Sequence, residues 1–200
     1  MRKFLFAVAI VIGMLGLAIS TTAQVTDYSL LLQSGKIVPE ENLSKLNGES
    51  PLLRKSIFNG KAYLTLQFYS PPTEAKKAEL RAAGIELLDY LPRLSFTAAV
   101  REPVSVASLR GFGVRSVLVL EGLQKTIPSL LQQDVPAYAV KHSGYADVDI
   151  VLYENIAESI IREALQPLDA TIVRNTAVFR MVTVRVPQQQ VAALTDLPFV

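Results

Sequence analysis

The chain has 200 residues, of which 50% are hydrophobic and 19% are charged, so it can bury a core and is not a disordered tail. Its length suits one ordinary domain or two small ones. It carries 20 Lys and Arg against 18 Asp and Glu and has no cysteine, which excludes disulfides and a lipid-modified lipoprotein anchor.

Residues 1–23 have the parts of a secretory signal peptide. Arg2 and Lys3 precede an uncharged stretch, residues 4–19, and small residues lead to a cleavage site that we place between Ala23 and Gln24. An uncleaved membrane anchor is the alternative, but a bilayer-spanning helix needs about twenty residues and this stretch is shorter. We therefore expect a secreted, periplasmic or cell-surface protein without a stable membrane span after cleavage.

Cleavage would also change the charge balance of the protein. Loss of Arg2 and Lys3 would leave eighteen basic and eighteen acidic residues. A neutral chain gives no support for nucleic acid or an anionic surface as a partner. Without disulfides, such a secreted protein must be held together by its core or travel attached to another protein.

Residues 24–61 form a leader segment rich in turn residues. Pro39 suits the first turn of a helix, and we expect a short helix over residues 40–46. The segment is predicted to pack against the domain that follows it.

Residues 62–120 predict a first domain with the order βαββαβ. Thr73 and Gly84 are suitable caps for a helix between the first two strands. Strands are expected where β-branched, aromatic or alternating apolar residues gather. The predicted strands are residues 62–69, 85–92, 94–100 and 114–120, and the predicted helices are residues 74–83 and 104–110. This is the order of a ferredoxin-like, or split βαβ, domain.

Residues 121–147 predict a connector, in which residues 137–142 would add an edge strand to a second domain. The second domain, residues 148–200, repeats the order of the first. Its predicted strands are residues 148–155, 169–175 and 178–186, and its predicted helix is residues 157–165.

An internal duplication is indicated by matching positions in the two halves. Val-Arg-x-Pro begins at Val100 and again at Val184, and the buried pair Val106 and Leu109 recurs 85 residues later. In the first strand, Leu66 and Leu152 are 86 apart. We therefore predict an α+β chain of two tandem ferredoxin-like domains, with antiparallel sheets and helices on one face. Residues 197–200 would open the fourth strand of the second copy, which is truncated there.

Residues suited to catalysis or metal binding are few. His142, the single histidine, lies in the connector, and the chain has no G-x-S-x-G motif to supply a nucleophile. Asp147 and Asp149 alternate, but a calcium loop needs several more oxygen ligands at fixed spacing. We expect these residues to be solvated, and we predict no catalytic residue, no metal site and no cofactor.

Two other patterns resemble binding motifs. Gly111 and Gly113 stand near arginines, but they follow a helix and precede a strand, the reverse of a phosphate-binding loop. We interpret them as residues that end the helix. Tyr63, Phe68 and Phe96 lie on strands, as the stacking aromatics of an RNA-binding sheet do. Neutral charge and secretion favour core packing instead.

The stretch YLTLQFYSPPTEAKKAELRAAGIELLDYLPRLSFTAAV, residues 63–100, resembles the N-terminal propeptide region of secreted bacterial subtilisin-like serine peptidases. The resemblance extends over residues 57–200 and is most specific at residues 72–92. It implies an intramolecular chaperone and temporary inhibitor, whose sheet packs on the peptidase and whose tail lies in the substrate cleft. Such modules template slowly folding peptidases and block the cleft as an added strand.

The resemblance also has departures. The Asp, His and Ser motifs of the peptidase are absent, and the inhibitory tail would follow Val200. The chain is therefore expected to be the leader and proregion of a longer precursor, a serine endopeptidase, or a truncated copy of one. Its partner would be a peptidase domain in cis or in trans, and no contact residue is carried over. A free-standing secreted inhibitor, or a protein-binding or structural module of the same fold, is the alternative.

Overall fold

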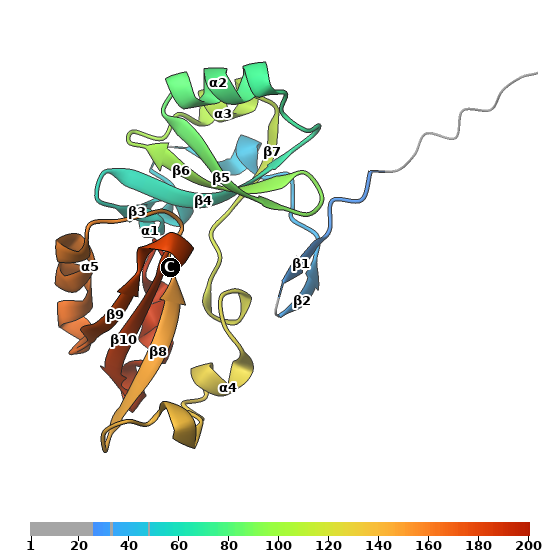
Figure 1. Ribbon diagram of the computed structural model, residues 1–200. Coiled ribbons are helices and arrows are strands. Elements are labelled where there is room, and N and C mark those ends of the chain that lie inside the picture. The colour runs from blue at the N-terminus through green and yellow to red at the C-terminus, as the bar shows by residue number, and fades with distance from the viewer. Residues whose placement is uncertain (1–25, 33, 48) are drawn as a thin grey trace, which may run out of the picture.

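The computed structural model describes residues 26–32, 34–47 and 49–200. The predicted signal peptide, with Ala23 and Gln24 at its cleavage site, lies outside these residues. The described chain combines antiparallel sheets with helices, in two units that are visible in Figure 1. None of the helices in these residues is long and apolar enough to cross a membrane.

The first unit is built around one central strand, β4, which is buried over residues 62–68. Its main strands are antiparallel in the order β7-β4-β6-β5, and the short β3 pairs with the start of β4 beside β7. The strands are β3 (Ile57–Phe58), β4 (Lys61–Phe68), β5 (Ile85–Leu91), β6 (Ser95–Arg101) and β7 (Val114–Leu118).

Two helices, α2 (Glu74–Ala82) and α3 (Val106–Gly111), cover one face of this sheet (Figure 1). Thr73 caps α2, because its hydroxyl oxygen accepts a hydrogen bond from the Lys76 amide at 3.2 Å. Gly84 follows α2 with φ +80°, a left-handed conformation that favours glycine. Leu80 and Leu109, one from each helix, are fully buried in the core beneath them.

The segment before the first unit lies along the outer edge of β7. The Asn42 side chain donates to the Val117 carbonyl at 2.7 Å and accepts from the Val117 amide at 3.0 Å, and the Ser116 hydroxyl donates to the Glu40 carbonyl. The helix expected over residues 40–46 is a single 3-10 turn. The elements of this segment are β1 (Leu30–Leu32), β2 (Gly35–Ile37), η1 (Leu43–Lys45) and α1 (Pro51–Lys55).

The second unit has a three-stranded antiparallel sheet in the order β8-β10-β9. Alternate residues of β10 are fully buried against α5, which supplies Ile161 and Leu165 to the core. Two short 3-10 helices follow β10 and bury Val191 and Leu194. The elements are β8 (Tyr145–Val151), α5 (Glu158–Leu165), η4 (Gln166–Leu168), β9 (Thr171–Thr176), η5 (Ala177–Phe179), β10 (Met181–Pro187), η6 (Gln188–Gln190) and η7 (Ala192–Asp196).

The connector between the units differs from its prediction. It contains η2 (Gly122–Gln124), α4 (Pro128–Leu131) and η3 (Ala137–Ala139), so the expected edge strand over residues 137–142 is wrong. Only His142 makes an isolated bridge, to Tyr145, because Gly144 at φ +82° closes a tight turn between them. The strand expected over residues 148–155 instead begins at Tyr145 and ends at Val151.

The two units share an interface on the face of the first sheet that α2 and α3 leave open. Tyr63 and Ala99 of the first sheet belong to the hydrophobic core of the second unit. The rings of Phe58 and Phe199 stack across the interface, with centroids 4.3 Å apart. The first sheet is therefore covered on both faces.

Candidate functional site

The free edge of β8 is the structural basis of the candidate site. Within the described chain, β8 pairs with β10 alone and forms one end of the second sheet. The Leu152 amide donates to the Arg180 carbonyl at 2.8 Å, and the Gln188 amide donates to the Gly144 carbonyl at 2.9 Å. The even-numbered residues of this stretch are therefore the ones whose backbone groups bond to β10. Because backbone groups alternate along a strand, the N–H and C=O groups of Asp149 and Val151 point to the free edge.

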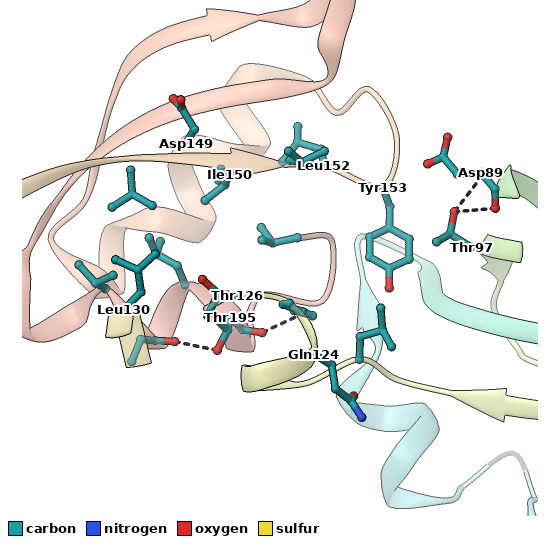
Figure 2. Close-up of a pocket in the computed structure, with 18 residues that line it drawn as sticks. Asp89, Thr97, Gln124, Thr126, Leu130, Asp149, Ile150, Leu152, Tyr153 and Thr195 are labelled. Carbon is teal, nitrogen blue, oxygen red and sulfur yellow. Dashed lines mark hydrogen bonds between the residues drawn. The ribbon is translucent and has the colours of Figure 1, made fainter. Parts of the chain in front are cut away.

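A groove of about 360 Å³ runs along this edge, between β8 and the connector. Figure 2 shows Ile150 of β8 and Leu152, the residue after β8, on one side and Gln124, Thr126 and Leu130 of the connector on the other. The floor is closed by η7 and the residue before it. The apolar side chains that line the groove include Leu130, Val148, Ile150, Leu152, Val191, Leu194 and Val200.

Lys125 fixes the connector against the end of the chain. Its Nζ donates to the carbonyl oxygens of Thr195 and Leu197, both at 2.9 Å. Burial lowers the pKa of Lys125 to about 8, while the nearby carboxylates of Asp196 and Glu121 act in the opposite direction. The amine therefore holds the wall of the groove in place, in a lining that also contains the polar side chains of Asp89, Gln124 and Asp149.

The end of the groove is closed by the interface between the units. The Tyr153 amide donates to the Phe199 carbonyl at 2.9 Å, so the chain end lies against the β8 edge. The Tyr153 ring contacts Tyr63 of β4 edge-on, with centroids 5.6 Å apart, and burial raises the pKa of Tyr153 to about 12. At this pKa the phenol is neutral, and the residue acts as part of the wall.

The chemistry of the groove suits binding of an extended peptide. It offers outward-pointing backbone N–H and C=O groups beside apolar side chains, the combination that recognises an added β-strand. Thr126 also lines the groove, whereas the hydroxyl of Thr195 in its floor already donates to the Ala192 carbonyl at 2.8 Å. In the residues that the structure describes, no three His, Cys, Asp or Glu side chains gather as a metal site.

Of the polar residues that the sequence singled out, Asp149 lines the groove, whereas His142 and Asp147 do not. His142 is exposed, at the turn before β8. The Asp147 carboxylate accepts two hydrogen bonds from Arg185, at 2.7 and 2.8 Å, and these hold its pKa below the usual value. Asp149 accepts from the Thr183 hydroxyl at 2.5 Å. The two aspartates are thus engaged in cross-strand pairs with β10 on the face away from the core.

The glycines and aromatic residues have the structural roles expected for them. Gly111 is the last residue of α3, and Gly113, at φ +81°, leads into β7. Tyr63, Phe68 and Phe96 are 3%, 1% and 9% exposed, so none offers a surface on which a base could stack.

Lys125 and Tyr153 are the residues of the site that the sequence did not reveal. Lys125 stands in a stretch interpreted as a solvated connector, and its partners are carbonyl groups about seventy residues away. Tyr153 was taken as the interior of a strand. A signal for Tyr153 exists in Tyr69, which likewise lies just after the first strand of its unit.

Residues 31–121 match the model of a family described as a domain of unknown function, DUF8729. The match begins in β1, covers the first unit, and ends before β8 and most of the groove. No curated protein and no solved structure matches the chain.

Proposed function

We propose that the chain is a non-catalytic proregion of a secreted subtilisin-like serine peptidase, acting as intramolecular chaperone and temporary inhibitor. The peptidase domain would be supplied in cis by a longer precursor, or in trans. One observation carries the proposal: two β-α-β-β units with the same strand pairing follow one another along the chain. Residues 72–92 of the first unit resemble such proregions.

The registers of the two sheets support a tandem of ferredoxin-like units. Lys61 lies opposite Arg101 between β4 and β6, and Tyr145 lies opposite Pro187 between β8 and β10. Paired residue numbers sum to 162 in the first sheet and to 332 in the second, so the spacings of the first and third strands add up to 170. The pairs suggested by the sequence, Leu66 with Leu152 and Val100 with Val184, are 86 and 84 apart and fit this sum. The order β7-β4-β6-β5 with two helices on one face is that of a complete ferredoxin-like unit.

The arrangement of the units selects the surface that would meet a peptidase. The second unit covers the first sheet, so that Tyr63 and Thr65 are buried. The open sheet face is that of the second unit, opposite α5, where Tyr138, Val151 and Val173 are 77%, 56% and 47% exposed. This face combines exposed apolar side chains with the Asp147–Arg185 and Asp149–Thr183 pairs, and is the mixed kind of surface found at non-obligate interfaces. We propose that the second sheet, rather than the first, packs on the peptidase.

Titration of the chain from Gln24, extended by the residues that its reading frame encodes between Val200 and a peptidase motif, against a subtilisin tests this proposal, with hydrolysis of a peptide substrate as the readout. We expect slow, tight inhibition followed by degradation of the added chain. Val173→Asp places a charge in the proposed contact and should weaken inhibition by about tenfold. Val38→Asp, on a valine that is 66% exposed in the N-terminal segment, is the matched control and should have no effect.

Three results would contradict the proposal in different ways. Inhibition that Val173→Asp and Val38→Asp leave equally strong would exclude the second sheet as the contact surface. Lasting inhibition without degradation would favour a free-standing inhibitor. A folded chain that inhibits no subtilisin would favour a binding or structural module with another partner.

A further inference from the structure

Residues 195–200 join three parts of the molecule that are far apart in sequence. Two of the contacts are polar: the Lys125 amine of the connector donates to the carbonyl oxygens of this segment, and the Tyr153 amide, just after β8, donates to the Phe199 carbonyl at 2.9 Å. The third contact reaches the first unit. One short segment therefore touches the connector, the end of β8 and the first sheet at once.

The contact with the first unit is aromatic. The Phe199 ring is fully buried and lies against the ring of Phe58 in β3, with centroids 4.3 Å apart. The other apolar side chains that the first unit supplies to the core of the second are those of Tyr63, Leu88 and Ala99. Phe199 is thus the side chain through which the segment holds the first unit.

Much of the remaining interface is polar. Glu154 accepts from the Tyr63 hydroxyl, and Arg180 forms an ion pair with Asp89 at 2.9 Å. Thr65 is fully buried under the second unit, and among the described residues its hydroxyl has no hydrogen-bond partner. Burial of such a hydroxyl is unfavourable, and water satisfies it once the units separate. Polar interfaces between units of one chain are typical of units that move relative to each other.

The connector supplies the tether for such a motion. Residues 132–134, which follow α4, are exposed, and Gln133 has a left-handed conformation with φ +62°. Their amides donate to carbonyl groups of α4, within the connector itself. The chain can therefore bend after this point without breaking these bonds, as a hinge requires.

We propose that residues 195–200 form a clasp, and that its release lets the two folded units separate about the connector. The structure describes the closed state, in which the clasp ties the second unit to Phe58 and to Lys125. In the open state, the face of the first sheet that carries Tyr63 and Thr65 meets solvent. Any event that displaces the clasp is thereby coupled to exposure of this face. The inference does not depend on a peptidase partner.

Thiol labelling measures the separation directly, because the chain has no cysteine. Thr65→Cys places a thiol on the covered face, whereas Val117→Cys and Val182→Cys place thiols in the cores of the first and second units, where both valines are fully buried. A buried thiol reacts with DTNB only in molecules that have opened at that place. Relative to the same chains in denaturant, the thiol of Thr65→Cys should react about tenfold or more faster than both core thiols.

A matched pair of phenylalanine variants tests the clasp. Phe199→Ala removes the ring that contacts Phe58, and Phe179→Ala removes a ring that is 68% exposed in η5. Burial of one ring in an aromatic contact corresponds to about a ten- to hundredfold change in an equilibrium constant. Phe199→Ala should therefore raise the labelling rate of Thr65→Cys by about this factor, whereas Phe179→Ala should leave it unchanged.

Leu165→Ala distinguishes release of the clasp from unfolding of the second unit. Leu165 is fully buried at the end of α5, close in sequence to Asp169, which accepts from Tyr145 at the start of β8. This variant weakens the second core away from the clasp. It should speed labelling of Val182→Cys without a larger increase at Thr65→Cys. Circular dichroism establishes that each variant is folded.

Three results would overturn the proposal. If Thr65→Cys reacts no faster than the two core thiols, the units separate only when they unfold. If Phe199→Ala and Phe179→Ala give equal rates at Thr65→Cys, the segment is not a clasp. If Leu165→Ala raises the rate at Thr65→Cys as much as Phe199→Ala does, the exposure of this face comes from unfolding of the second unit.

Discussion

The polar cluster that joins the two units gives a quantitative test of their interface. Glu154, just after β8, accepts hydrogen bonds from the Lys61 amine at 2.6 and 2.9 Å and from the Tyr63 hydroxyl at 2.7 Å. Burial and the adjacent carboxylate raise the pKa of Tyr63 far above its usual value, so the phenol remains a hydrogen-bond donor. Glu154→Gln removes the carboxylate charge to which Lys61 and Tyr63 of β4 donate, and it preserves the shape of side chain 154.

The size of the effect follows from the exposure of the pair. An exposed ion pair contributes at most about 1 kcal/mol, whereas removing one partner of a fully buried pair costs about 3–5 kcal/mol. The side chains of Lys61 and Glu154 are 39% and 18% exposed, which is between these limits. We therefore expect Glu154→Gln to lower the free energy of unfolding by about 2 kcal/mol. Its coupling energy with Lys61→Met should be about 1 kcal/mol.

Urea unfolding of the two single variants and the double variant gives the coupling energy. Lys45→Met is the matched control, because Lys45 and its partner Glu40 have side chains that are 71% and 80% exposed, and it should cost less than about 0.5 kcal/mol. Hydrogen exchange should report faster opening of both β4 and β8 in Glu154→Gln. A coupling energy near zero, or destabilisation confined to one unit, would refute the view that this cluster holds the units together.

Two further predictions concern single residues. Burial lowers the pKa of Lys125 to about 8 from 10.5, so between these pH values the unfolded chain retains a proton that the folded chain has lost. The free energy of unfolding of the parent chain, relative to that of Lys125→Met, should therefore rise with pH across this window by up to roughly 3 kcal/mol in urea titrations. A difference in free energy that does not change with pH would contradict the burial of the amine. Gly84→Ala should cost about 1–3 kcal/mol in thermal unfolding, because residue 84 has φ +80° and its new Cβ would lie 3.1 Å from the Arg101 Cβ. Gly111→Ala, which meets no atom within 4 Å, is the control and should be neutral or stabilising.

Local sequence patterns were sufficient for most elements of the first unit. Thr73 and Gly84 marked the ends of α2 correctly, because capping depends on chemistry within a few residues. Strand β4 was predicted to within one residue at each end. The short elements before it were less predictable: α1 (Pro51–Lys55) and β3 are stabilised by contacts with the first unit rather than by their own periodicity.

The site was harder to predict than the strands around it. The pattern identified the second unit but moved its first strand by three residues, because Asp147 interrupts the apolar pattern until its pairing with Arg185 of β10 is known. The interface was not predicted at all. Tyr63 is buried by the second unit, and no local signal distinguishes such a side chain from one buried by its own core.

The free edge of β8 could pair with exposed strands of other molecules. Exposed edges invite aggregation, and proteins protect them with charges or covering segments. Asp147 and Asp149 place carboxylates along β8, and the connector forms a wall opposite the open backbone groups. A strand that pairs with this edge must therefore fit into the groove between β8 and the connector. The charges and the connector hinder pairing of β8 with the edges of other sheets, while the groove leaves room for one extended chain. This is the selectivity that a peptide-binding groove requires.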